Sequence, residues 1–206
     1  MITHQKHLRA LYTSAAAELT NAKQTSNFAD VLLHIGNNLW VREMNEKLTV
    51  SFFGHRLIED YHTVESKLYE LLRIIIQKEN REIEFLVGRN GDFDLMVTSV
   101  IRKLKKEFCS DNVYLNLVMP YETAELRDNA EAFEDYYDSV EICEASADCN
   151  FKYAIVARNR DMIDRSDVVI VYVKNKSGGA FQALKYAQKS QKRIINLYIQ
   201  NTDNSF

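Results

Sequence analysis

Residues 48–56 read LTVSFFGHR, a short apolar segment that stops at a glycine and is followed at once by His55 and Arg56. Such a run favours a buried β-strand. A glycine at its end lets the backbone approach a ligand closely, and the two side chains that follow could face an anion. The same residues could also be only a buried strand with a polar exit. The exits of the other strands decide between these two interpretations.

The segment opens an alternation of strands and helices. Short apolar runs recur near 83–87, 113–118, 168–173 and 193–198, and the stretches between most of them carry apolar residues at helical spacing. Short apolar strands that alternate with helices are typical of a parallel sheet covered on both faces. The sequence therefore predicts an α/β fold, a Rossmann-like doubly wound parallel sheet of about five strands, over residues 47–206.

Two regions lie outside this alternation. Residues 1–46 are rich in helix formers and predict an N-terminal helical hairpin whose apolar stripe packs on the sheet domain or on a second subunit, which makes a homo-oligomer the expectation. Residues 121–150 hold ten acidic residues against one basic residue, Arg127, and indicate a helix with a solvated acidic face. The residues expected to be buried in the hairpin are Leu32, Ile35, Leu39 and Trp40.

Composition excludes several classes of function. The formal net charge of -3 provides no global field for nucleic acid, so a nucleic-acid partner is expected to be unlikely, although a local anion site is compatible with it. No apolar run reaches the length of a membrane span, and a cytoplasmic protein with no membrane partner is expected. The three cysteines have no C-x-x-C spacing, so no metal and no cofactor are predicted.

Three strand exits share glycines and cationic or amide side chains. In a parallel sheet these exits meet at one edge, where ligands bind near the switch in strand order. Free N–H groups at a helix start attract phosphate, and glycine lets it approach. This convergence favours a ligand site over a polar exit. The predicted ligand-binding residues are Gly54, His55, Arg56, Gly88, Asn90, Gly91, Asp92, Arg158, Asn159, Ser177, Gly178 and Gly179.

Some of these residues also have structural interpretations. Asp92 is a natural N-cap for a helix that starts at Phe93, and His55 could be a core histidine bonded to a neighbouring strand. The pair Gly178–Gly179 could form only a turn between a strand and a helix. Around Arg158, the spacing of Arg160 with Asp164 and of Asp161 with Arg165 suits surface ion pairs on a helix.

Four motifs, taken in order, carry a resemblance to a known family. The stretches FFGHR, FLVGRNGDFDLMV, ARNRDMIDRSDVVIVYV and SGGAFQALKYAQKSQKRIINL resemble the SLOG superfamily, a Rossmann-like group that includes the DprA and lonely guy proteins. Within it, the sequence is most similar to the YpsA-like branch. The resemblance covers about Leu48 to Leu197 and implies binding of a nucleotide or a nucleotide-derived ligand at the strand exits, with Gly178 and Gly179 cradling a phosphate.

The sequence departs from the catalytic motif of that superfamily. Enzymes similar to the lonely guy protein carry P-G-G-x-G-T-x-x-E, and alignment on Gly178–Gly179 places the motif's glutamate on Lys185. An ammonium group cannot act as a carboxylate nucleophile or base, so no catalytic residue is predicted. Binding or sensing of a nucleotide or an ADP-ribose-like ligand is the leading hypothesis. The alternatives are an N-glycosidase or phosphoribohydrolase that uses Asp92 or Asp94, and DprA-like binding of single-stranded nucleic acid.

Overall fold

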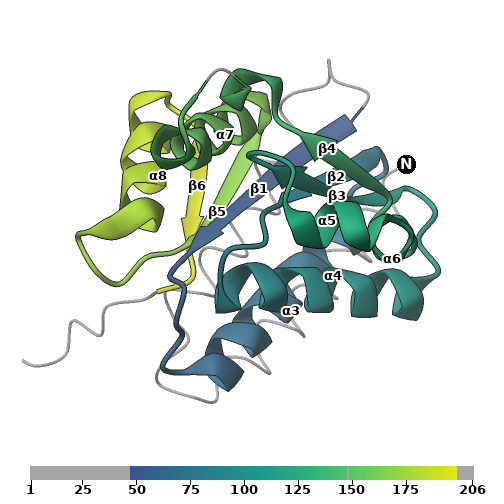
Figure 1. Ribbon diagram of the computed structural model, residues 1–206. Coiled ribbons are helices and arrows are strands. Elements are labelled where there is room, and N and C mark those ends of the chain that lie inside the picture. Colours follow the sequence, from purple (N-terminus) through teal and green to yellow (C-terminus); the bar gives the residue numbers. More distant parts are fainter. Residues whose placement is uncertain (1–46, 148, 199–206) are drawn as a thin grey trace, which may run out of the picture. The chain divides into compact units, whose positions relative to one another are not determined.

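The computed structural model describes residues 47–147 and 149–198, which form a single parallel sheet between two layers of helices (Figure 1). The sheet has six strands in the order β4-β3-β2-β1-β5-β6, and every neighbouring pair is parallel. This confirms the predicted Rossmann-like class, with one strand more than expected. The strands are β1 (Lys47–Gly54), β2 (Glu82–Val87), β3 (Val113–Met119), β4 (Ser139–Ile142), β5 (Val168–Tyr172) and β6 (Arg193–Asn196).

The first strand lies at the centre of the sheet. Residues 48–53 are all buried, because β1 pairs with β2 on one side and β5 on the other and is covered on both faces. A strand in that position is buried on both faces, which fits the largely apolar run, in which Thr49 and Ser51 are buried polar residues. The order of strands reverses between β1 and β5, so the switch point of the sheet lies beside the GHR exit.

The two helical layers cover opposite faces of the sheet (Figure 1). Helices α3 and α4 pack against each other on one face, and α7 packs against α8 on the other. The helix α4 shows an apolar stripe in which seven residues are buried, including Phe93, Val97 and Leu104. The helices are α3 (Tyr61–Lys78), α4 (Asp92–Phe108), α5 (Ala124–Asp128), α6 (Ala130–Tyr136), α7 (Phe151–Arg165) and α8 (Gly178–Lys189), with a short 3-10 turn η2 (Glu144–Ser146).

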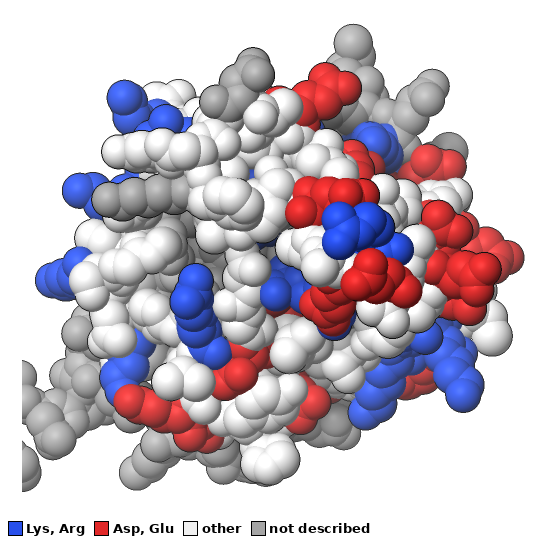
Figure 2. All heavy atoms as spheres, in the orientation of Figure 1, with Lys and Arg blue, Asp and Glu red and all other residues white. Residues whose placement is uncertain are grey.

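The acidic segment is more ordered than its composition indicates. It contains α5, α6 and the edge strand β4, which pairs with β3 from Asn116–Ser139 to Met119–Ile142. The sequence SVEI of β4 is too short and too polar to stand out among acidic residues, because an edge strand is covered less than a central one. Figure 2 shows the acidic side chains gathered over the α5–α6 region of this face.

Three further expectations concerned the organisation of the chain. The N-terminal hairpin with Leu32, Ile35, Leu39 and Trp40 lies outside the described residues, so it stays a prediction. In the described part of the chain, no helix combines the length and apolar character that crossing a bilayer requires. Residues 47–147 and 149–198 likewise contain no group of three or more His, Cys, Asp or Glu that could hold a metal ion.

Candidate functional site

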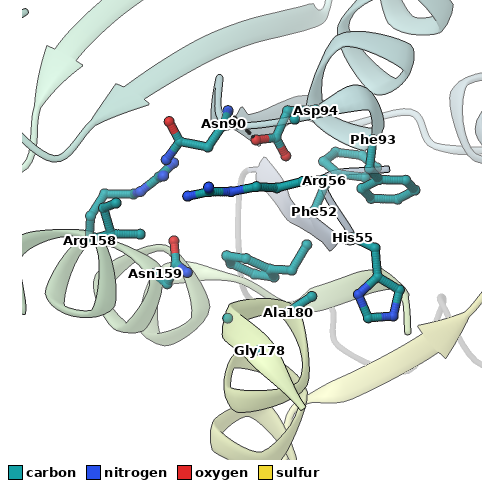
Figure 3. A pocket seen from close by; sticks show the side chains of 15 residues that line it. Phe52, His55, Arg56, Asn90, Phe93, Asp94, Arg158, Asn159, Gly178 and Ala180 are labelled. Carbon is teal, nitrogen blue, oxygen red and sulfur yellow. Dashed lines mark hydrogen bonds between the residues drawn. The ribbon is translucent and has the colours of Figure 1, made fainter. Parts of the chain in front are cut away.

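A pocket opens at the carboxyl edge of the sheet, beside the switch point between β1 and β5. Its cavity volume is about 400 Å³. The lining comes from the exits of β1 and β2, from α4, from the middle of α7 and from the start of α8. Figure 3 shows this arrangement. The lining residues are Phe52, Phe53, Gly54, His55, Arg56, Asn90, Gly91, Phe93, Asp94, Ile155, Arg158, Asn159, Gly178, Gly179 and Ala180.

Arg56 extends across the pocket toward Arg158, between Asn90 and Asn159 (Figure 3). Its side chain is exposed, and among the described residues no ion pair or side-chain hydrogen bond holds it. Its backbone is fixed, because the Arg56 carbonyl accepts a hydrogen bond of 2.9 Å from the Asp92 N–H. At Gly91 an added Cβ would lie 2.6 Å from the Arg56 Cα. Glycine at 91 therefore lets the two exits touch and leaves the guanidinium available to a ligand.

Arg158 is the second cation of the pocket and is almost completely buried, with an exposed fraction of 3%. Its Nη1 donates to the Val118 carbonyl at 3.0 Å, whereas its Nε has no hydrogen-bond partner within the described part of the chain. A buried charge normally satisfies its donors, so this buried and unpaired N–H is an exception within the described part of the chain. Gly88 makes this position possible, because a Cβ there would lie 2.4 Å from Arg158 Nη1.

Asp94 is the acidic group of the pocket. Its Oδ2 accepts the Asn90 N–H at 2.7 Å and would lie 3.1 Å from a Cβ on Gly88. Burial raises the pKa of the Asp94 carboxyl, while the Asn90 N–H and the charge of Arg158 act in the opposite direction. Burial also lowers the pKa of Arg158, against the attraction of Asp94. With two guanidinium groups against one carboxylate, the pocket favours an anionic ligand.

The amino terminus of α8 forms the opposite wall. Ser177 occupies the N-cap position, and its side chain makes no capping hydrogen bond, so the first N–H groups of the helix stay available. Gly178 has a φ of 84°, in the left-handed region that favours glycine. No atom lies within 4 Å of a Cβ built on Gly178 or Gly179, which means that open space faces both residues. This geometry suits a phosphate oxygen.

His55 positions the loop that precedes α8. Its Nε2 accepts the backbone N–H groups of Lys174 at 2.9 Å and Asn175 at 3.1 Å, so the proton of the neutral ring is on Nδ1. Figure 3 shows the imidazole at the margin of the pocket, away from Arg158. Burial and the charge of Lys174 lower the pKa of His55, which keeps the ring neutral. His55 thus acts on the pocket through the backbone of this loop.

Aromatic side chains supply the apolar part of the pocket. Phe93 packs on the end of β1, where a Cβ on Gly54 would lie 2.2 Å from the Phe93 Cγ. The Phe93 ring also stacks on Tyr172 with centroids 6.1 Å apart. The pocket therefore combines an apolar lining of largely buried rings with cations and helix N–H groups. This combination suits a nucleotide, which has an apolar base and an anionic phosphate.

Most of the residues that the sequence selected lie together. Nine of the twelve line the pocket, including Arg56 and Gly179 on its two sides. Gly88 lies behind Arg158 instead, Ser177 caps α8, and Asp92 is the first residue of α4, whose N-cap is Gly91 rather than Asp92. The apolar lining residues were not among those predicted from the sequence. Ile155 could have been predicted from helical spacing, because it lies one turn before Asn159.

The surface pairs expected on α7 are only half right. Arg165 pairs with Asp161 at 3.2 Å, as expected. The carboxylate of Asp164 instead accepts the Tyr186 hydroxyl at 2.9 Å, and Arg160 lies over the Tyr186 ring at 5.2 Å.

Comparisons with known proteins place the fold. No protein-family model matches the chain, and no curated protein matches its sequence. Two solved structures of DNA processing protein A are similar to it, each with a TM-score of 0.53 over 77% of this chain. The protein from Helicobacter pylori, whose structure was described with a unique single-stranded DNA binding mode, is 20% identical, and 68% of its chain is covered. The protein from Streptococcus pneumoniae (DprA) is 14% identical, and 53% of its chain is covered.

The chain has a DprA-like fold. This supports the SLOG resemblance at the level of the fold. It also corrects one expectation from the sequence. The net charge of -3 was taken to make a nucleic-acid partner unlikely, and that inference is wrong, because the fold is shared with a protein that has a single-stranded DNA binding mode. Net charge alone therefore does not exclude a nucleic-acid partner, because a local cluster of cations can attract phosphates on a molecule of acidic net charge.

Proposed function

We propose that the pocket between β1, α7 and α8 binds one nucleotide unit of a single-stranded nucleic acid. The observation that carries this proposal is the pairing of Arg56, an exposed guanidinium without a partner in the described part of the chain, with the uncapped start of α8 across the pocket. Both groups favour a phosphate oxygen: the guanidinium offers a planar fork of donors, and the helix start offers backbone N–H groups.

The shape of the pocket favours a single strand. A cavity of about 400 Å³ can hold a nucleotide-sized group, whereas a duplex needs a broad basic surface or a helix that fits its groove. The apolar lining of the pocket, which includes the partly buried Ile155, suits the face of a base. In a single strand the bases are free to leave their stack, so one base can enter while its phosphate is held. The likeness in fold to a single-stranded DNA-binding protein supports the same ligand class.

A free nucleotide or an ADP-ribose-like molecule is the second candidate. The specific observation in its favour is the cavity volume of about 400 Å³, which lies in the range of small-molecule sites. For turnover of such a ligand, Asp94 is better placed than Asp92, because only Asp94 lines the pocket. Lys185 gives the chain no carboxylate at the position of the superfamily's glutamate. From the four motifs we also infer a place in the YpsA-like branch.

The test measures binding of a fluorescein-labelled thymidine oligonucleotide by anisotropy. Arg56→Ala is expected to weaken binding by roughly 1.5–3 kcal/mol, the scale of a hydrogen bond to a charged group. Arg56→Lys keeps the charge but loses the planar fork, so it should recover only part of the affinity. Unlabelled thymidine monophosphate and ADP-ribose serve as competitors, and release of free base is assayed in parallel.

The outcomes separate the candidates. Tight binding of the oligonucleotide, with weak competition by single nucleotides, supports single-stranded nucleic acid as the ligand. If only the small competitors bind, the second candidate replaces the first. Normal binding by Arg56→Ala would show that Arg56 is a surface residue without a role in the site.

A further inference from the structure

A pair of aromatic side chains lies at the edge of the sheet that carries the pocket. Phe151 is the first residue of α7, and its exposed fraction of 74% is unusual for a phenylalanine. Its ring contacts Tyr121, which follows β3, with centroids 4.5 Å apart and planes inclined by 69°. Both residues lie beyond carboxyl ends of strands, because β3 leads to Tyr121 and β4 leads to α7. The pair is therefore on the side of the sheet where the pocket opens.

Helical spacing links Phe151 to the pocket. Residues four and seven apart lie on one face of a helix, so Phe151 shares a face with Ile155 and Arg158, both of which line the pocket. Exposure decreases along this face of the helix, from the exposed Phe151 through the partly buried Ile155 to the buried Arg158. Phe151 stands about 5.4 Å, one helical turn, beyond Ile155. The hydroxyl of Tyr121 also acts electrostatically on Arg158 and raises its pKa, against the larger effect of burial. Tyr121 therefore lies near the same wall of the pocket.

From this juxtaposition we propose that Tyr121 and Phe151 form a stacking platform for the base that neighbours the nucleotide in the pocket. This inference rests on the proposed function. A nucleobase fits the exposed Phe151 ring because its faces are flat and apolar. It is also linked to a phosphate, for which the adjacent pocket supplies the site. The T-shaped contact with Tyr121 orients the Phe151 ring. Most of the Phe151 side chain stays exposed in this contact.

The experiment compares three proteins on two ligands. Stacking of a base on an aromatic side chain contributes about 1–3 kcal/mol, so Phe151→Ala should weaken binding of a thymidine oligonucleotide about 5- to 150-fold. Tyr153→Ala is the matched control, because Tyr153 is 58% exposed on the same helix but points roughly 200° away from Phe151 around the axis. On an abasic oligonucleotide of the same length, the wild type and Phe151→Ala should bind equally.

A second variant reports stacking directly. Trp40 is the only tryptophan of the chain, so Phe151→Trp combined with Trp40→Phe places the single indole on the platform. Its fluorescence should be quenched when the oligonucleotide binds. Equal affinities of Phe151→Ala and Tyr153→Ala, together with an unquenched indole, overturn the platform and leave the pocket proposal standing. A changed oligomeric state of Phe151→Ala with unchanged affinity also overturns it, in favour of a contact between copies. Failure of the wild type to bind any oligonucleotide overturns the proposed function itself.

Discussion

Arg158 places a full positive charge where almost no water reaches it. Two groups compensate the charge, the Val118 carbonyl at 3.0 Å and the carboxylate of Asp94. Gly88 leaves the space that the guanidinium occupies. The sequence could predict that Arg158 belongs to the site, because Arg160 and Asp161 have ion-pair partners four residues on, whereas Met162 stands at that spacing from Arg158. It could not predict the burial, since that depends on contacts between β2, β3, α4 and α7 that only the folded chain brings together.

Gly54 is the residue at which packing leaves the least room. Replacing Gly54 with Ala would place a Cβ 2.2 Å from the Phe93 Cγ, which forces the ring or the strand to move. Overpacking of this kind costs about 1–3 kcal/mol of the free energy of unfolding. Urea denaturation, followed by circular dichroism, measures the loss.

The matched control for that substitution is Gly179→Ala. No atom lies within 4 Å of a Cβ at this position, so the free energy of unfolding should stay within about 0.5 kcal/mol of the wild type. The double variant Gly54→Ala/Phe93→Leu should lose less free energy of unfolding than the two single variants lose together, because both substitutions act on the same contact. Equal stability of Gly54→Ala and Gly179→Ala would contradict the close packing of β1 on α4.

The loop between β5 and α8 depends on one imidazole. His55 accepts two backbone N–H groups of this loop, so protonation at Nε2 removes both hydrogen bonds and adds a charge close to Lys174. Lys174 is itself paired with Glu59, and Tyr172 lies edge-on to the His55 ring at 6.0 Å. The loop that precedes α8 therefore loses both of these hydrogen bonds when Nε2 of His55 is protonated.

This dependence gives a pH effect of definite sign. The pKa of His55 is lowered in the folded protein from its ordinary value of 6.5, so the unfolded chain takes up a proton first as the pH falls. Stability from His55 is complete above pH 6.5 and decreases below it, until the folded protein is protonated too. Thermal unfolding between pH 7.5 and 5.5 should show this loss, and His55→Gln should show a shallower dependence. Parallel curves for the two proteins would refute the role of His55.

The central strands could be predicted from the sequence, whereas the edge strand β4 could not. The strands near 48–53, 83–87 and 168–173 are mostly apolar because they lie inside the sheet, and their pattern is visible without the fold. The strand β4 contains Val140 and Ile142 between acidic residues, and its pairing with β3 depends on the edge being free. The helix starts were less predictable, since Gly91 rather than Asp92 occupies the N-cap position of α4.

At the scale of the whole molecule, the acidic surface and the cationic pocket are separate. The net charge is -3, and acidic side chains gather over the α5–α6 region (Figure 2). Binding should therefore depend on a few contacts in the pocket and not on a long basic track.

Salt dependence tests that separation. Each phosphate neutralised on a single strand contributes a slope of about -0.7 to the logarithm of affinity against the logarithm of salt concentration. With Arg56 and Arg158 as the cations, the slope should lie between about -0.7 and -1.4, and Arg56→Ala should reduce its magnitude by about 0.7. Anisotropy titrations over a series of sodium chloride concentrations give the slope. A slope steeper than about -3 would indicate an extended basic track elsewhere on the protein.

The pairing of β1 with β5 has a consequence for the order in which the protein acquires its site. Val50 and Val168 are partners in the sheet, although most of the domain separates them along the chain. Contacts of such long sequence separation form late in folding. During synthesis on the ribosome, the half of the sheet from β1 to β3 can assemble first, while α8 must still emerge. The pocket therefore cannot bind its ligand until nearly the whole domain has left the ribosome, and a nascent chain gains no stabilisation from the ligand before that point.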